Sequence, residues 1–127
     1  RLADRLAAAE LAGAEVCMVD PRVAGAARAI ARTCPLAVCS SNSRHAVLRA
    51  LDRAGLSGEV TRVVAREDVA APKPDPEGLM LLASGAGIDP GELLMIGDAP
   101  ADREAARRAG AAFLPVQDLV ALAEGAA

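Results

Sequence analysis

The sequence predicts an α/β protein in which a parallel sheet carries helices on both faces. Short apolar runs alternate with alanine-rich segments of helical spacing along the 127 residues, as in chains built from strand–helix–strand units. The run "PLAVCS" at residues 35–40 is continuous in its apolar character, which is typical of a strand buried on both faces. Aromatic residues make up only 1% of the chain, so the core has to be built from Ala, Leu and Val.

The first half of the chain supplies six elements. Residues 2–12 have helical spacing and predict a helix, "EVCMV" at 15–19 predicts a short strand, and residues 23–33 predict an alanine-rich helix. The strand at 35–40 follows. "SNSR" then begins a helix that runs to Gly55, a residue suited to a helix C-cap. "TRVVA" at 61–65 predicts the next strand.

The second half begins with a loop, because the prolines of "REDVAAPKPDP" exclude regular structure. Asp75 and Pro76 suit the N-cap and first turn of a helix that ends near Gly85. "DPGE" has the spacing of a capping box, which predicts one short turn before an apolar strand at 93–97. The remaining predicted elements are a helix over 101–109, a strand over 111–116 and a helix over 117–124.

Charge and hydropathy exclude several kinds of partner. The net charge of −3 and the pI near 5.1 argue against nucleic acid and membrane surfaces. No apolar run approaches the roughly 20 residues of a membrane span, and no signal-peptide pattern is present. The three cysteines have no CxxC or zinc spacing, and Cys39, which lies inside an apolar run, is expected to be a buried reduced thiol. A cytoplasmic protein is therefore expected, and its oligomeric state is left open.

Polar residues follow several of the predicted strands directly. Ser40 ends the first buried run, and Asp98 and Asp102 follow the run at 93–97. Lys73, the single lysine beside 13 arginines, lies between two prolines in the loop after the strand at 61–65. In parallel sheets the carboxyl ends of the strands share one edge, where ligands bind. A hydroxyl at a helix start, a lysine and an acidic pair can together hold a phosphoryl group and a divalent cation.

These segments resemble motifs of the haloacid dehalogenase-like superfamily, in particular its phosphatase and β-phosphoglucomutase-like subfamily. "LAVCSSNS" is similar to the family's second motif, "EDVAAPKPDPEGLMLL" to its third, and "LLMIGDAPADREAARRAG", with its GDxxxD pattern, to its fourth. The resemblance extends from about Val23 to Val116. It implies a Rossmann-like core and a phosphatase that acts on a small phosphorylated substrate with Mg²⁺ through an aspartyl-phosphate.

The resemblance also implies roles for individual residues. Ser40 would hydrogen-bond a phosphoryl oxygen with help from the N–H groups of Ser41 and Asn42. Lys73 would neutralise the phosphoryl group and the nucleophile. Asp98 would hold Mg²⁺, and Asp102 would support the metal site. Lys73 and Ser40 are thus the expected catalytic residues, and the same two with Ser41 and Asn42 the expected phosphate-binding residues.

The family's first motif, DxD followed by Thr or Val, does not occur anywhere in the 127 residues. Its first aspartate is the nucleophile in the family. We therefore expect that the first core strand and most of the helical cap are absent, that residues 1–21 are a remnant of cap and linker, and that residues 22–127 are the core. This chain alone is then expected to be inactive.

Five alternatives stay open or are weighed against this interpretation. Asp20 could act as the nucleophile, although Arg22 stands where the second aspartate belongs. The chain could be a noncatalytic binding or regulatory module, or a sugar-phosphate mutase of the same family. Receiver domains are disfavoured, because their acidic pair comes early in the chain and here it comes last. Haloalkanoic acid dehalogenases need no metal, and the GDxxxD pair disfavours them.

Overall fold

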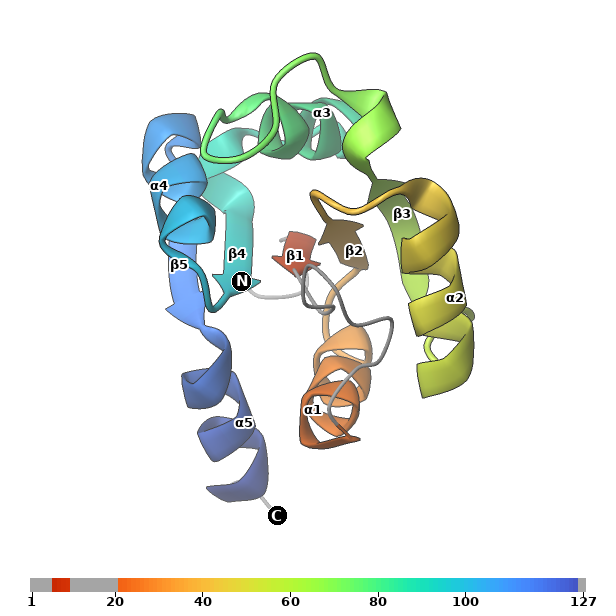
Figure 1. The fold of residues 1–127 in the computed structure, drawn as a ribbon. Helices are drawn as coiled ribbons and strands as arrows, with labels where there is room; N and C mark the ends of the chain where they lie inside the picture. Colours follow the sequence, from red (N-terminus) through yellow and green to blue (C-terminus); the bar gives the residue numbers. More distant parts are fainter. Residues whose placement is uncertain (1–5, 10–20, 126–127) are drawn as a thin grey trace.

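The protein folds around a five-stranded sheet in which every pair of neighbouring strands is parallel. A computed structural model describes residues 6–9 and 21–125 (Figure 1). The spatial order of the strands is β3-β2-β1-β4-β5. The strands are β1 (Leu6–Ala9), β2 (Leu36–Cys39), β3 (Val60–Val64), β4 (Leu93–Gly97) and β5 (Ala112–Pro115). The predicted α/β class with a parallel sheet is confirmed.

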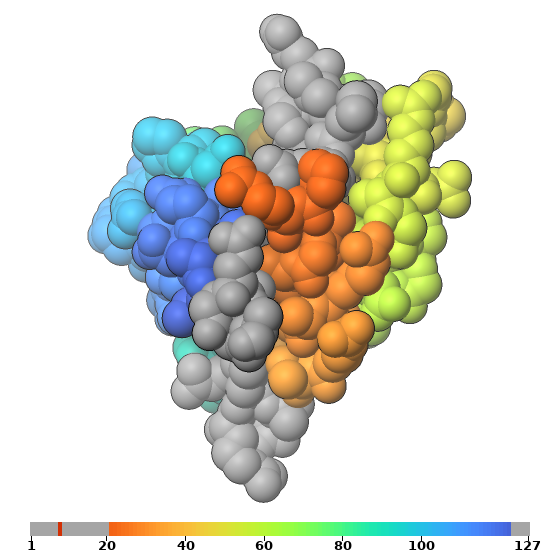
Figure 2. All heavy atoms as spheres, turned by 90° about the horizontal axis from the view of Figure 1, so that it is seen from below, coloured from red at the N-terminus to blue at the C-terminus, as the bar shows by residue number. Residues whose placement is uncertain are grey.

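Helices cover both faces of this sheet, as its parallel connections require. One core cluster joins α1 (Pro21–Ala31), α2 (Arg44–Ala54) and α5 (Val116–Gly125) to one face through Leu36, Val38 and Ile96. The other joins α3 (Glu77–Ala86) and α4 (Pro100–Ala109) to the opposite face through Ala37, Leu93 and Met95. From below, α1 lies beside α5 on the surface of the first layer (Figure 2). Short 3₁₀ turns, Arg66–Asp68 and Pro90–Glu92, precede α3 and β4.

The central strand β1 corrects the helix that we expected over residues 2–12. Leu and Ala favour helices in isolation, but β2 and β4 each present an unpaired edge to the slot between them. Pairing Ala7–Ala9 with Leu36–Val38, and Leu6–Ala9 with Leu93–Ile96, satisfies those backbone groups. Ala8 is completely buried, and its small side chain fits under α3. Tertiary pairing thus overrides local propensity.

The neighbouring expectations have mixed outcomes. The strand candidate at 15–19 and Asp20 lie outside the described residues. The boundary expected at residue 21 stays a prediction. Of residues 1–21, only Leu6–Ala9 and Pro21 are described, and Leu6–Ala9 belong to the sheet. The remaining predicted strands and helices form, with ends that differ by a few residues; α1, for instance, begins at Pro21 and not at Val23.

Local capping explains why the helices end where they do. Pro76, and not Asp75 as expected, is the N-cap of α3, and Asp75 before it accepts a hydrogen bond from the Glu77 N–H at 2.9 Å. Gly55 and Gly87 end α2 and α3 in the left-handed conformation that glycine adopts without strain. No helix in the described ranges 21–125 is long and apolar enough to cross a bilayer. Ser40 follows β2 and Asp98 follows β4. Because the strands are parallel, both residues lie at the same edge of the sheet.

Candidate functional site

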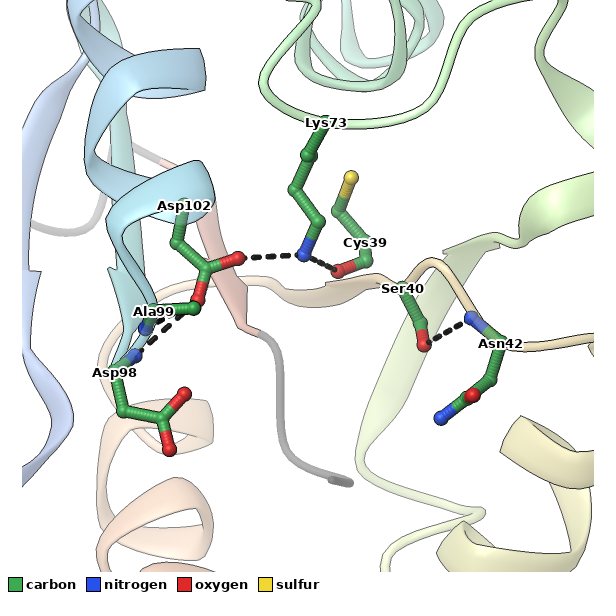
Figure 3. A network of polar contacts seen from close by, with 7 residues as sticks. All are labelled: Cys39, Ser40, Asn42, Lys73, Asp98, Ala99 and Asp102. Carbon is green, nitrogen blue, oxygen red and sulfur yellow. Dashed lines mark hydrogen bonds and ion pairs between the residues drawn. The ribbon is translucent and has the colours of Figure 1, made fainter. Parts of the chain in front are cut away.

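Lys73 is the centre of a buried polar network at this edge (Figure 3). Its Nζ donates to Asp102 Oδ1 at 2.7 Å and to the Cys39 carbonyl oxygen at 3.0 Å. The side chains of Lys73 and Asp102 are only 6% and 2% exposed. Removing either charge would leave the other buried without its countercharge, at a cost of about 3–5 kcal/mol. The pair therefore ties the loop before α3 to the end of β2 and to α4.

Asp102 is fully committed to the protein. Its Oδ2 accepts from the backbone N–H groups of Asp98 at 3.2 Å and Ala99 at 3.0 Å, and its Oδ1 holds Lys73. This close fit depends on Gly97. A Cβ at Gly97 would lie 2.4 Å from Asp102 Oδ2 and 2.7 Å from its Cβ and Cγ. Asp102 thus shapes the turn that carries Asp98.

The side chain of Asp98 is exposed at the same edge (Figure 3). Among the described residues no hydrogen bond or ion pair to its carboxylate is found, whereas its backbone N–H is held by Asp102. The contrast divides the acidic pair into two tasks. Asp102 organises the turn, whereas the carboxylate of Asp98 is exposed.

Ser40 and the residues after it form the start of α2. Ser40 Oγ accepts from the Asn42 N–H at 3.0 Å, and Ser43 Oγ accepts from the Ala46 N–H at 3.2 Å, so Ser43 is the N-cap. Ser40 is 5% exposed, and its own N–H donates to the Val64 carbonyl oxygen. Accepting from Asn42 leaves the Ser40 hydroxyl hydrogen for another acceptor.

Arg44, Glu67 and Asp68 connect this helix start to the turn after β3. The Arg44 N–H donates to Glu67 Oε1 at 2.8 Å, and its guanidinium contacts Asp68 Oδ2 and the Val63 carbonyl oxygen. The Arg44 N–H holds the pKa of the Glu67 carboxyl below its ordinary value. Asn42 O also accepts from the Arg66 N–H. The segment 40–44 is thereby fixed against 63–68, and Arg44 is used within the protein.

The donor set fits a magnesium ion in part. Mg²⁺ keeps several waters and is commonly bound by one or two carboxylates together with phosphate oxygens. The exposed Asp98 carboxylate is suited to this, whereas both oxygens of Asp102 already accept hydrogen bonds. Among the described residues no group of three or more His, Cys, Asp or Glu side chains could hold a metal. Asp98 is therefore the ligand that these residues offer.

A match to a protein-family model shows the family to which the chain belongs. The model of the haloacid dehalogenase-like hydrolases matches residues 2–110. The chain belongs to that family. The match includes β1 to β4 and α4, and with them Ser40, Lys73, Asp98 and Asp102. The resemblance inferred from the three motifs is thus confirmed.

Three curated relatives of this haloacid dehalogenase-like chain are phosphatases by name. Pyrophosphatase PpaX of Bacillus velezensis is 37% identical over 75 residues, 59% of this chain and 35% of the relative. Phosphoglycolate phosphatase of Rhodospirillum rubrum is 34% identical over 63% of this chain and 33% of the relative. Validoxylamine A 7'-phosphate phosphatase of Streptomyces hygroscopicus subsp. limoneus is 34% identical over 71% and 44%. The chain thus spans less than half the length of these relatives.

Solved structures give the same fold. A haloacid dehalogenase-superfamily hydrolase of subfamily IA from Geobacter sulfurreducens superposes with a TM-score of 0.68 at 29% identity, over 75% of this chain and 49% of that one. A family hydrolase from Deinococcus radiodurans, solved with bound phosphate and sodium, gives 0.63 at 27% identity, over 75% and 42%. The Rossmann-like core assignment is therefore confirmed.

Three features of the site were not predicted from the sequence: the pairing of Lys73 with Asp102, the contact of Arg44 with Asp68 and the close approach of Asp102 to Gly97. The motifs identify Lys73 and Asp102 separately, but not that they pair, because that contact joins residues 29 positions apart. Arg44 is a poor motif residue, and its interaction with Asp68 depends on the turn geometry after β3. Gly97 carried a signal, since a glycine at a strand end often marks close approach of another group.

Proposed function

We propose that the protein carrying this chain is a Mg²⁺-dependent phosphatase of small phosphorylated metabolites that works through an aspartyl-phosphate. The buried contact of Lys73 with Asp102 and the Cys39 carbonyl carries the proposal, since it holds an ammonium group at the strand edge that also presents Ser40 and Asp98. The phosphatase names of the curated relatives support the reaction class.

In this proposal each residue has a task that its contacts allow. The Ser40 hydroxyl donates to a phosphoryl oxygen, with Ser41 and Asn42 forming the rest of the anion site. Lys73 neutralises phosphoryl charge, and Asp102 holds Lys73 in place. Asp98 holds Mg²⁺, which would supply charge neutralisation at the transferring group. The nucleophilic aspartate is not among the described residues.

Phosphoryl transfer depends mainly on positioning and charge stabilisation, and this chain's residues contribute to both. Asp102 fixes the backbone at Asp98 and the direction of Lys73 simultaneously, so the cation and the metal ligand keep one relative placement. The 40–44 segment is held against β3 by Arg44 and Asp68. The site is consequently preorganised before any ligand binds.

A noncatalytic binding module is the second candidate, because DxD followed by Thr or Val is absent from the sequence. It would use the same anion site without turnover. A sugar-phosphate mutase is the third candidate. Both share the phosphoryl site with a phosphatase, so binding tests the site and turnover tests the reaction.

Titration of the chain with inorganic phosphate, in the presence and in the absence of Mg²⁺, tests the site. Ser40→Ala should weaken binding about tenfold, the effect of losing one hydrogen bond to a charged group. Lys73→Arg should weaken it as well, because a planar guanidinium cannot replace a point charge in a site with 6% exposure. Asp98→Asn should remove the dependence on Mg²⁺.

Two matched variants serve as controls. Ser57→Ala and Asp52→Asn alter exposed residues of the same types, Ser57 between α2 and β3 and Asp52 on α2. They should bind phosphate as the unaltered chain does. Equal affinities for all five variants would refute the site. In a version of the protein that hydrolyses phosphate esters, wild-type turnover by Lys73→Arg would refute the role of Lys73.

A further inference from the structure

A hollow of about 280 Å³ lies on the β5 side of Asp98. It opens over the ends of β4 and β5, which lie side by side beneath α4 (Figure 1). Asp98, Pro100, Arg103, Phe113 and Gln117 are among its lining residues. The hollow shares Asp98 with the candidate site described above. A ligand bound at that site can therefore extend into the hollow.

Arg103 is the cationic side chain among the residues that line this hollow. Its guanidinium carbon lies 4.6 Å from the centre of the Phe113 ring, the only phenylalanine of the chain. An aromatic ring attracts the charge but accepts no hydrogen bond in the guanidinium plane. Among the described residues no carboxylate forms an ion pair with Arg103. Its planar set of N–H donors is therefore available to a bound oxyanion.

The other charges of the hollow do not cancel Arg103. Glu104 also lines it, but its carboxylate is held by Arg107 at 2.6 Å and by Arg108 at 2.8 Å. Asp98 faces the hollow as an anion, and a divalent cation held there would reverse that local charge. With a divalent cation bound at Asp98, the hollow would be electropositive.

The spacing between neighbouring strands determines how far the phosphoryl group lies from the hollow. Ser40 follows β2 and Asp98 follows β4, with β1 between them. Neighbouring strands are about 4.8 Å apart, so a phosphoryl group held between Ser40 and Asp98 lies roughly one strand spacing from the hollow over β4 and β5. A link of two or three atoms covers that distance.

We propose that Arg103, stacked on Phe113, forms a subsite for a second oxyanion of the substrate. This inference rests on the proposed function. It narrows the substrate class to small compounds that carry, besides the phosphoryl group, a carboxylate or a second phosphoryl group a few atoms away. Arg103 is then a specificity-determining residue, and it takes no part in the transfer itself.

Three phosphonates separate these possibilities. Propylphosphonate carries one anionic group, 3-phosphonopropionate replaces its terminal methyl group by a carboxylate, and 1,2-ethylenediphosphonate places a phosphoryl group there. Calorimetric titration of the chain at constant free Mg²⁺ should give about tenfold tighter binding of at least one dianionic probe than of propylphosphonate. The tighter of the two identifies whether the subsite takes a carboxylate or a phosphoryl group.

Arg103→Gln should bring this preference close to one while leaving propylphosphonate affinity within twofold. Arg103→Lys, which keeps the charge, should retain part of the preference. Arg49→Gln, which removes an exposed charge from α2, is the matched control and should change neither value. Circular dichroism melting of Arg103→Gln checks that it folds.

Different results reject different statements. If the unaltered chain shows no preference, or if Arg103→Gln keeps it, the subsite is refuted while the phosphoryl site stands. If propylphosphonate binding is absent, or is unchanged in Ser40→Ala, the proposed function fails and the subsite proposal fails with it.

Discussion

At the scale of single residues, the site depends on how closely Asp102 can approach the backbone. Its carboxylate bridges Lys73 and two N–H groups, and it can do so only because Gly97 has no side chain. A buried carboxylate with all its oxygens hydrogen-bonded is stabilising, whereas a displaced one is costly. The strand end is thus a position where backbone and side chain share space.

Gly97→Ala should destabilise the protein by about 1–3 kcal/mol, the range for forcing extra atoms into a packed site. The added Cβ would contact Asp102 Oδ2 at 2.4 Å, so Asp102 has to move away from Lys73. Urea unfolding monitored by circular dichroism measures the change. Gly91→Ala is the control, because its Cβ would meet nothing within 4 Å. Equal midpoints for the two variants would contradict the explanation.

At the scale of elements, α4 combines a first turn that belongs to the candidate site with a charged exposed face. Asp102 serves the site in its first turn. Glu104 binds Arg107 and Arg108 at spacings of three and four residues, which stabilise helices. These hydrogen bonds, that of Arg107 first, lower the pKa of Glu104 from 4.5 to about 2. The contacts leave Arg103 as the basic side chain of α4 that faces the hollow.

The lowered pKa of Glu104 predicts a pH dependence. Because the folded-state pKa lies below the unfolded value, the contribution of Glu104 to stability is complete above about pH 4.5 and is lost as the pH falls towards 2. Glu104→Gln should remove this part of the acid sensitivity. Urea unfolding between pH 5 and 2.5 measures it, with Glu59→Gln, an exposed residue outside α4, as the control. A carbon NMR titration giving Glu104 an ordinary pKa would disprove the assignment.

At the scale of the whole molecule, the sheet is continuous through its centre. The first core strand of the family was expected to be absent. Leu6–Ala9 lie between β2 and β4 and pair with both strands. The described part of β1, with the sequence LAAA, contains no acidic residue, and its Ala8 is buried in the core. The sheet can therefore have its central strand although the nucleophile motif is absent from the sequence.

The absence of this motif predicts that residues 1–127 alone do not hydrolyse p-nitrophenyl phosphate above background with Mg²⁺. The sequence contains no DxD followed by Thr or Val, and loss of a nucleophile removes several orders of magnitude in rate. Phosphate binding by the same preparation shows that the anion site is intact. Robust hydrolysis that Asp20→Asn abolishes would instead make Asp20 the nucleophile.

Much of the molecule could be predicted because it is encoded in local patterns. Apolar runs of strand length, helix caps such as Gly55, and the order of Ser40, Lys73 and Asp98 after successive strands are all properties of short segments. Strand–helix alternation then implies a parallel sheet, and a parallel sheet brings its carboxyl ends together. Fold class and the candidate residues follow from the sequence by these steps, and the family follows from the resemblance of the three motifs to known ones.

The tertiary structure alone decided what depends on contacts between distant segments. Residues 6–9 have the composition of a helix, and they are a strand because two buried strand edges need partners. The resemblance implies a supporting role for Asp102, but GDxxxD does not show how Asp102 supports the site. In the structure Asp102 binds Lys73, 29 positions earlier, and Asp98 faces outward. At residues 6–9 the free energy of pairing with distant strands exceeds the local helix preference. In both cases the partners lie too far apart in the sequence for a local pattern to contain them.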